Sequence, residues 1–373
     1  MKVLMIAGEA SGDLHGAGVV KELKKLDPSV SIFGIGGDKM EAAGMELIYH
    51  IRELSFMGFL EVIQHLPLIR SVEKSLSSLL KFRKPDIILL IDYPGFNLRF
   101  AKTAHEYGIK IVYYISPQVW AWNPGRVSKM KGVIDKMLVV FPFEVDIYRQ
   151  KGIDVEFVGH PLLEVLAEPQ DRGGFFKRYG LDDKKPVVGL FPGSRKQEIE
   201  RIFPPMIGAA RMLLQQLGAQ IVVGVAPSLD NAYVKSFIRD EGLMQCINHA
   251  TYDVMGNVDI AIVTSGTATL ETGYFRTPMI VVYKTSFVTY LIGRLLIEIK
   301  NIGLVNIVAG KEIVPELIQG DVTPDKLAKL AAKLLGDKRR LAEIASGLHV
   351  IRENLGAPGA SKRVADVLIA MAA

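Results

Sequence analysis

The feature that most constrains the fold of this sequence is a set of short, uninterrupted apolar runs that alternate with helical patterns. Such runs lack the polar alternation of a half-buried strand and are typical of parallel strands covered on both faces. Helical patterns such as Glu61 to Lys81 and Asn97 to Tyr107 would supply the covering layers. The pattern therefore predicts an α/β fold of repeated βα units. The runs are Val3 to Ala7, Ile32 to Ile35, Ile87 to Ile91, Ile109 to Ile115, Met137 to Phe141, Val187 to Phe191, Ile221 to Val225, Ile260 to Val263 and Met279 to Val282.

The runs form two series, separated by the looser stretch "AEPQDRGG". We place the domain break between about Pro161 and Gly174, which predicts a first domain over 1–165 and a second over 166–354. "GAPGASKRVADVLIAM" opens on a Pro-Gly break and predicts a terminal helix within about 355–373, and packing on the first domain is one arrangement that the pattern leaves open. The expected architecture is two facing Rossmann-like domains that bind ligands at the carboxyl ends of their strands.

The composition excludes several classes of protein. The chain has 373 residues, 49% of them apolar, and predicts a soluble globular protein with a large core. Its net charge of +5 favours phosphate groups or an anionic membrane surface, whereas nucleic acid is not expected, because no basic run interleaves with aromatic residues. Cys246 is the single cysteine, so a disulfide framework and a cysteine zinc site are excluded, and a reducing cytoplasm is the expected compartment. We expect neither a signal peptide nor a spanning helix.

Two carboxylates follow predicted strands of the first domain. Glu9 lies in the loop "AGEASGDLHGAG", which lacks the G-x-G-x-x-G spacing of a dinucleotide site. Asp92 ends the strand in "DIILLIDYPGFN", before a Pro-Gly turn and Asn97, which we expect to cap the next helix. Structural roles are open for both residues, as an acid at a helix start and as a turn residue. The functional interpretation makes Asp92 a general base whose pKa is tuned by Glu9.

Both tryptophans of the chain lie two residues apart in "YYISPQVWAWNPGR", Tyr113 to Arg126. The pattern leaves open whether they plug the core beneath the sheet or offer aromatic rings for stacking on a sugar. Arg126 has two open roles as well, as a phosphate contact or as a solvated surface residue.

A candidate anion site lies in the second domain. In "LFPGSRKQEIERIF", Gly193 and Ser194 follow a strand, and Arg195 precedes a helix whose first N–H groups are unpaired. A surface salt bridge at a capping turn is the alternative role for Arg195. A second predicted helix begins with small residues that are suited to binding an anion. Glu271 lies one turn into this helix, where it could accept hydrogen bonds from ribose hydroxyls. Two such helix starts predict a nucleoside diphosphate without a required metal. The small residues are Thr264, Ser265, Gly266 and Thr267.

Several of these segments together resemble the lipid A disaccharide synthase family of GT-B glycosyltransferases. "GEASGD", "MGFLEV", "IDYPGFN", "SPQVWAW", "GSR" and "TSGTATLE" occur in the order and spacing of that family, over nearly the whole chain. The resemblance implies transfer of 2,3-diacylglucosamine from UDP to the 6-hydroxyl of 2,3-diacylglucosamine 1-phosphate, with inversion at the anomeric carbon. It also implies peripheral action at the cytoplasmic face of the inner membrane, with no obligatory metal or other cofactor. The oligomeric state stays open.

The resemblance also assigns roles to single residues. Asp92 would be the base that takes the acceptor proton, with Glu9 as a second essential acid. Arg195 and Thr264 to Thr267 would hold the diphosphate, Glu271 the ribose, and Asn306 in "GLVNIVAG" would complete the donor site. Family members commonly carry a second Asp where this chain has Gly95, so we expect Asp92 to act without a second acid in that loop.

An apolar cluster in "LSFMGFLEVIQHLPLI" fits an acyl chain or a bilayer surface, although a buried helix is the alternative. The cluster comprises Phe56, Met57, Phe59 and Leu60.

Two rival functions share parts of this pattern. A sugar-nucleotide epimerase could use the same UDP site but would need no acceptor lipid. A non-catalytic nucleotide-binding or membrane-associated protein would keep the anion site but would tolerate loss of Asp92. A dehydrogenase is the least favoured, because neither domain carries a dinucleotide fingerprint.

Overall fold

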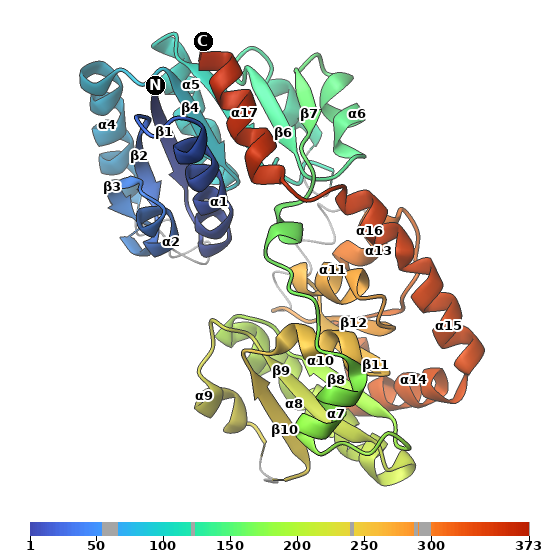
Figure 1. Cartoon of the computed structure of the whole chain (residues 1–373). Coiled ribbons are helices and arrows are strands. Elements are labelled where there is room, and N and C mark those ends of the chain that lie inside the picture. Colours follow the sequence, from blue (N-terminus) through green and yellow to red (C-terminus); the bar gives the residue numbers. More distant parts are fainter. Residues whose placement is uncertain (54–65, 121–123, 239–241, 287–289, 291–299, 373) are drawn as a thin grey trace. The chain divides into compact units, whose positions relative to one another are not determined.

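The computed structural model describes residues 1–53, 66–120, 124–238, 242–286, 290 and 300–372. It divides into two compact units (Figure 1). Unit 1 comprises Met1–Glu164 and Leu355–Ala373, and unit 2 comprises Val165–Asn354. Each unit has one parallel sheet flanked by helices, as the apolar runs predicted.

Unit 1 contains a seven-stranded sheet within the described residues, in the order β3-β2-β1-β4-β5-β6-β7. Its strands are β1 (Lys2–Ala7), β2 (Ser31–Gly36), β3 (Glu46–His50), β4 (Ile87–Ile91), β5 (Lys110–Tyr114), β6 (Lys136–Val139) and β7 (Val155–Phe157). Its helices are α1 (Ala10–Leu26), α2 (Asp38–Ala42), α4 (Leu66–Arg83), α5 (Pro94–Glu106), α6 (Glu144–Arg149) and α17 (Ala360–Ala372), with short 3-10 turns at Ile51–Glu53, Pro124–Lys129 and Pro161–Glu164.

Unit 2 contains a six-stranded sheet within the described residues, in the order β10-β9-β8-β11-β12-β13. Its strands are β8 (Val187–Phe191), β9 (Gln220–Val225), β10 (Met244–Asn248), β11 (Ile260–Thr264), β12 (Met279–Tyr283) and β13 (Glu316–Ile318). Its helices are α7 (Arg172–Tyr179), α8 (Lys196–Leu217), α9 (Asn231–Lys235), α10 (Thr251–Asn257), α11 (Thr267–Tyr274), α13 (Leu304–Ala309), α14 (Pro324–Gly336), α15 (Lys338–Gly347) and α16 (His349–Leu355), with a 3-10 turn at Gln319–Asp321.

The strand order reverses once in each sheet. In unit 1 the chain builds outward in one direction from β1 and in the other from β4, and these two strands pair in parallel with Ala7 beside Ile91. In unit 2 the same reversal lies between β8 and β11, where Phe191 pairs with Val263. Open parallel sheets bind ligands at such a reversal, outside the carboxyl ends of the strands.

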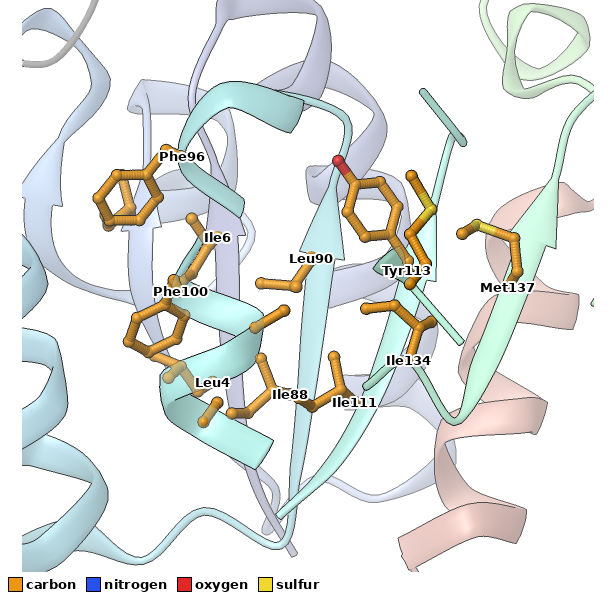
Figure 2. Close-up of a cluster of buried hydrophobic side chains, with 14 of the residues drawn as sticks. Leu4, Ile6, Ile88, Leu90, Phe96, Phe100, Ile111, Tyr113, Ile134 and Met137 are labelled. Carbon is orange, nitrogen blue, oxygen red and sulfur yellow. The ribbon is translucent and has the colours of Figure 1, made fainter. Parts of the chain in front are cut away.

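The core of unit 1 fixes the positions of these strands. Figure 2 shows apolar side chains of β1, β4 and β5 packed in one layer with Phe96 and Phe100 of α5. Pro94 begins α5, where its missing N–H costs no hydrogen bond. Tyr113 lies in the same cluster, with its hydroxyl group near the carboxyl ends of the strands.

Helix α17 returns to unit 1, where it packs on α1, β4 and β5 (Figure 1). Ser361 fixes its first turn, because its backbone N–H donates to Glu164 Oε1 over 2.7 Å and its hydroxyl donates to Glu164 Oε2. Val364, Ala365 and Leu368 are buried. The terminal helix is therefore part of the unit 1 core.

We expect Leu368→Ala to destabilise unit 1 by about 2–5 kcal/mol, because it leaves a cavity at a fully buried position. Urea unfolding, read together with hydrogen exchange of β4 and β5, measures this loss. Lys362→Ala on the exposed side of the same helix is the control. Equal effects of the two substitutions would contradict the core role of α17.

Candidate functional site

Glu9 and Asp92 lie at the strand-order reversal of unit 1. Glu9 is two residues beyond β1 and Asp92 directly follows β4, and these two strands are neighbours. The charge of Glu9 acts on Asp92, so the structure brings together the two carboxylates that the sequence predicted. Asp92 is thus placed where a substrate of a Rossmann-like domain is expected.

The backbone at Asp92 has an uncommon conformation. Asp92 and Tyr93 have φ values of 45° and 49°, in the left-handed region that non-glycine residues rarely adopt. Three hydrogen bonds hold this turn: Asp92 N donates to Tyr114 O (2.9 Å), while Tyr113 Oη (2.6 Å) and Asn97 Nδ2 (2.7 Å) both donate to Asp92 O. A turn fixed in this way aims the carboxylate of Asp92 independently of substrate.

Asn97 does not cap α5, contrary to the expectation from the sequence. Tyr93 occupies the N-cap position, and Asn97 lies inside the helix with no exposed surface. Its amide donates to the carbonyl oxygens of Ile91 and Asp92 instead. Asn97 therefore supports the turn that carries the candidate base.

The environment of Asp92 suits a proton acceptor. Burial and, to a smaller extent, the neighbouring charge of Glu9 together raise its pKa from 3.8 to about 6, against the opposing effect of a hydrogen bond from the backbone of Tyr93. A carboxylate with this pKa is ionised near neutral pH and still has appreciable affinity for a proton.

Glycines at two positions shape this region. A Cβ at Gly8 would lie 2.2 Å from the ring of Tyr93, so only glycine permits this close approach. A Cβ at Gly95 would meet nothing within 4 Å among the described residues. Steric crowding by the described residues therefore does not explain why position 95 lacks a second acid.

The candidate anion-binding residues lie at the strand-order reversal of unit 2. Gly193 to Arg195 lie just beyond β8. Thr264 is the last residue of β11, the adjacent parallel strand, and Ser265 to Thr267 follow it. Arg195 is exposed at the start of α8, and its Nη1 lies 3.2 Å from Glu198 Oε1. The ion pair of the alternative role is therefore present, and the phosphate role stays a prediction, since an exposed pair of this kind is weak and leaves the guanidinium available to an anion.

The segment Thr264 to Thr267 presents several polar groups at one point. Thr264 is 5% exposed, and its Oγ1 has no hydrogen-bond partner among the described residues. Ser265 Oγ donates to Ile302 O over 3.0 Å, and Gly266 precedes the first turn of α11 with a φ of 155°. An unpaired buried hydroxyl beside a helix start is unusual and is consistent with a bound anion.

Glu271 lies one turn into α11 and has a partner that the sequence analysis missed. The hydroxyl group of Tyr252 on α10 forms a hydrogen bond with its carboxylate. Burial, only partly opposed by the hydrogen bond from Tyr252, raises the pKa of Glu271 to about 7. Tyr252 therefore orients the carboxylate that the sequence assigned to a ribose.

Asn306 is buried, and both the nitrogen and the oxygen of its side-chain amide form hydrogen bonds within unit 2. Its Nδ2 donates to Val314 O and to Glu316 Oε1, both over 2.8 Å, and its Oδ1 accepts from the N–H groups of Ile313 and Val314. Glu316 also accepts from the N–H of Ile302, whose carbonyl receives the Ser265 hydroxyl. Asn306 would thus contribute to a donor site through the loop that it holds rather than by direct contact.

The predicted acyl or membrane contacts fall outside the described residues. They are Phe56, Met57, Phe59 and Leu60. None of the helices within the described ranges is both long and apolar enough to cross a bilayer. In the same part of the chain, no three His, Cys, Asp or Glu side chains are grouped so as to hold a metal ion.

Comparison with known sequences identifies relatives along the whole chain. The family model described as lipid-A-disaccharide synthetase matches residues 3–367. A lipid-A-disaccharide synthase of Syntrophus aciditrophicus is 44% identical over 372 residues, which cover 99% of this chain and 97% of that relative. One from Geobacter metallireducens is 43% identical with the same coverage.

Comparison with solved structures shows the same fold in more distant proteins. A UDP-GlcNAc 2-epimerase from Neisseria meningitidis, bound to UDP-GlcNAc, has a TM-score of 0.65 at 13% identity and covers 99% of this chain and 100% of that one. The calicheamicin glycosyltransferase CalG4 has a TM-score of 0.62 at 14% identity, with coverage of 99% and 97%. At these identities the likeness establishes the fold alone.

We expect Glu9→Gln to lower the pKa of Asp92 from about 6 toward 3.8, because the neighbouring negative charge is removed. The pKa should stay above 3.8, because burial is the larger cause of the rise. Carbon-13 NMR of aspartate-labelled protein, assigned with Asp92→Asn, measures the shift. Glu41→Gln on α2 serves as the control, and an unchanged Asp92 pKa in Glu9→Gln would show that the two carboxylates do not interact.

Proposed function

Because this chain belongs to the lipid-A-disaccharide synthetase family and is a glycosyltransferase of lipid A synthesis, we propose a specific donor, acceptor and base for its reaction. The donor is UDP-2,3-diacylglucosamine and the acceptor is 2,3-diacylglucosamine 1-phosphate. The products are UDP and the β-1,6-linked disaccharide 1-phosphate.

The observation that carries this proposal is the placement of Asp92. It follows β4 at the strand-order reversal of unit 1, on a turn held by Tyr113 and Asn97, with a pKa raised to about 6. In the proposed step Asp92 takes the proton of the acceptor 6-hydroxyl. The hydroxyl oxygen bonds to the anomeric carbon of the donor as the bond from that carbon to the diphosphate breaks. Attack opposite to the leaving group inverts the anomeric centre.

The leaving diphosphate is assigned to unit 2. Arg195, the first N–H groups of α11 and the buried Thr264 hydroxyl are groups that favour an anion. Glu271, held by Tyr252, would accept hydrogen bonds from the ribose. Since these groups are suited to stabilising the negative charge of departing UDP, we propose that transfer has no obligatory metal.

The epimerase alternative has less support. Solved 2-epimerases share the fold, but at 13–14% identity they carry no argument about reaction type. The relatives at 43–44% identity are named as synthases.

Incubation with the UDP lipid, with and without the acceptor lipid and in the presence of EDTA, tests the reaction directly. We expect UDP and the disaccharide, detected by mass spectrometry, only when both lipids are present. UDP release without acceptor would indicate hydrolysis or epimerase chemistry. Activity that is lost in EDTA and restored by a divalent cation would overturn the metal-independent step.

Asp92→Asn should reduce kcat by about 10²–10⁴-fold, because the base is removed, while UDP binding stays unchanged. In the unsubstituted protein kcat/KM should fall as the pH decreases below about 6, because Asp92 gains a proton there and can no longer accept one. Asp86→Asn, at the opposite end of β4, is the matched control. Near-normal turnover of Asp92→Asn would exclude Asp92 as the base.

We also propose peripheral contact with the anionic cytoplasmic face of the inner membrane, supported by the two lipid substrates, the net charge of +5 and the apolar cluster at Phe56 to Leu60. The protein should float with phosphatidylglycerol vesicles in a density gradient, and Phe56→Ser with Phe59→Ser should weaken this binding. Flotation that the double substitution leaves unchanged would rule out this cluster as the contact.

A further inference from the structure

Glu144 is a buried carboxylate that the proposed mechanism does not use. It is the first residue of α6, follows the loop after β6, and is 1% exposed. A carboxylate at such a position is costly unless hydrogen bonds compensate for the loss of water. The groups that donate hydrogen bonds to Glu144 therefore indicate which parts of the structure it holds in place.

These partners come from the loops that follow two adjacent strands. Glu144 Oε1 accepts from Ser116 Oγ (2.7 Å) and from Trp120 Nε1 (3.2 Å), both in the loop after β5. Glu144 Oε2 accepts from the N–H of Phe141, in the loop after β6 (3.1 Å). A single side chain thus joins the two loops and fixes the indole of Trp120.

The loop that carries Trp120 is strained where it leaves the sheet. Ile115 has a φ of 61°, a left-handed conformation that is a genuine outlier for a β-branched residue. Tyr148 Oη donates to Pro117 O over 3.1 Å and holds the loop from a second side. Such a conformation persists when neighbouring groups over-determine it, and it occurs preferentially at functional sites.

The Trp120 loop leaves the sheet one strand away from the candidate base. Strand β5 pairs with β4, and Asp92 N donates to Tyr114 O, the last residue of β5. Trp120 is half-buried and packs edge-on against Phe143, with ring centroids 5.5 Å apart, and Phe143 stacks on Phe141. With its N–H already bonded, the indole has only apolar ring surface left to offer, which suits the C–H face of a sugar ring.

We propose that Glu144 is a positioning residue that holds Trp120 as the aromatic surface on which the acceptor sugar lies. This inference rests on the proposed function, because it assigns Trp120 to the acceptor lipid of that reaction. Glu144 acts through the indole and takes no part in proton transfer. It should therefore affect acceptor binding and leave the donor site in unit 2 unchanged.

Glu144→Ala and Glu144→Gln, made in a Trp122→Phe parent, test the proposal, because Trp120 is then the remaining one of the two tryptophans. We expect Glu144→Ala to shift the emission maximum of Trp120 and to raise the KM for 2,3-diacylglucosamine 1-phosphate roughly tenfold. The donor KM and kcat should stay as in the parent. Glu144→Gln should give an intermediate effect, because its carbonyl oxygen can still accept from Ser116 and Trp120.

Leu368→Ala in the same parent is the control for loss of stability, since it weakens unit 1 away from this loop. If Glu144→Ala fails to fold, Glu144→Gln carries the emission test. Trp120→Phe, which leaves no tryptophan in this parent, carries the test of the acceptor KM, which should rise because the Phe ring cannot bond to Glu144. An unchanged acceptor KM, or an equal rise for both substrates, overturns the proposal.

Emission also separates this inference from the proposed function. Addition of 2,3-diacylglucosamine 1-phosphate to the parent should change Trp120 emission even without turnover, and this change should be reduced in Glu144→Ala. A parent that shows the emission change but forms no disaccharide would overturn the reaction and support the acceptor surface. A parent that forms disaccharide without any emission change would overturn the acceptor surface alone.

Discussion

The parallel pairing of β1 with β4, and of β8 with β11, is the constraint on which the candidate chemistry depends. At each pair the strand order reverses, so the two following connections turn away from each other and leave the strand ends uncovered. Asp92 and Glu9 occupy one such point, and Arg195 and Thr264 occupy the other. Removal of either pairing would separate the candidate groups that lie at that point.

The central part of each sheet could be predicted from the sequence, and its edges could not. Strands β1, β4, β8 and β11 are buried along nearly their whole length and therefore form uninterrupted apolar runs. The strands without such a run are β3, β7, β10 and β13, which form the four sheet edges and are only partly buried. An edge strand needs no continuous apolar sequence, so its pairing becomes visible only in three dimensions.

The candidate site was predictable where a residue directly follows a strand, because open parallel sheets bind their ligands at the carboxyl ends of the strands. Asp92 and Arg195 became candidates in this way. The supporting roles of four residues were not predicted, because these roles depend on contacts between elements. The four are Tyr113, Asn97, Tyr252 and Glu144. Tyr252 forms a hydrogen bond with Glu271, 19 positions further along the sequence (271 − 252), and Glu144 accepts a hydrogen bond from Ser116, 28 positions before it. No local pattern encodes such distances.

Unit 1 is interrupted by unit 2, since α17 comes from the far end of the chain. This has a consequence for synthesis on the ribosome. Unit 2 ends at Asn354 and can fold as soon as that residue has emerged, whereas unit 1 waits for the last helix to cover α1, β4 and β5. Most of unit 1 is thus translated before unit 2 but completed after it, and until then the sheet that carries Asp92 keeps exposed the apolar surface that α17 later covers.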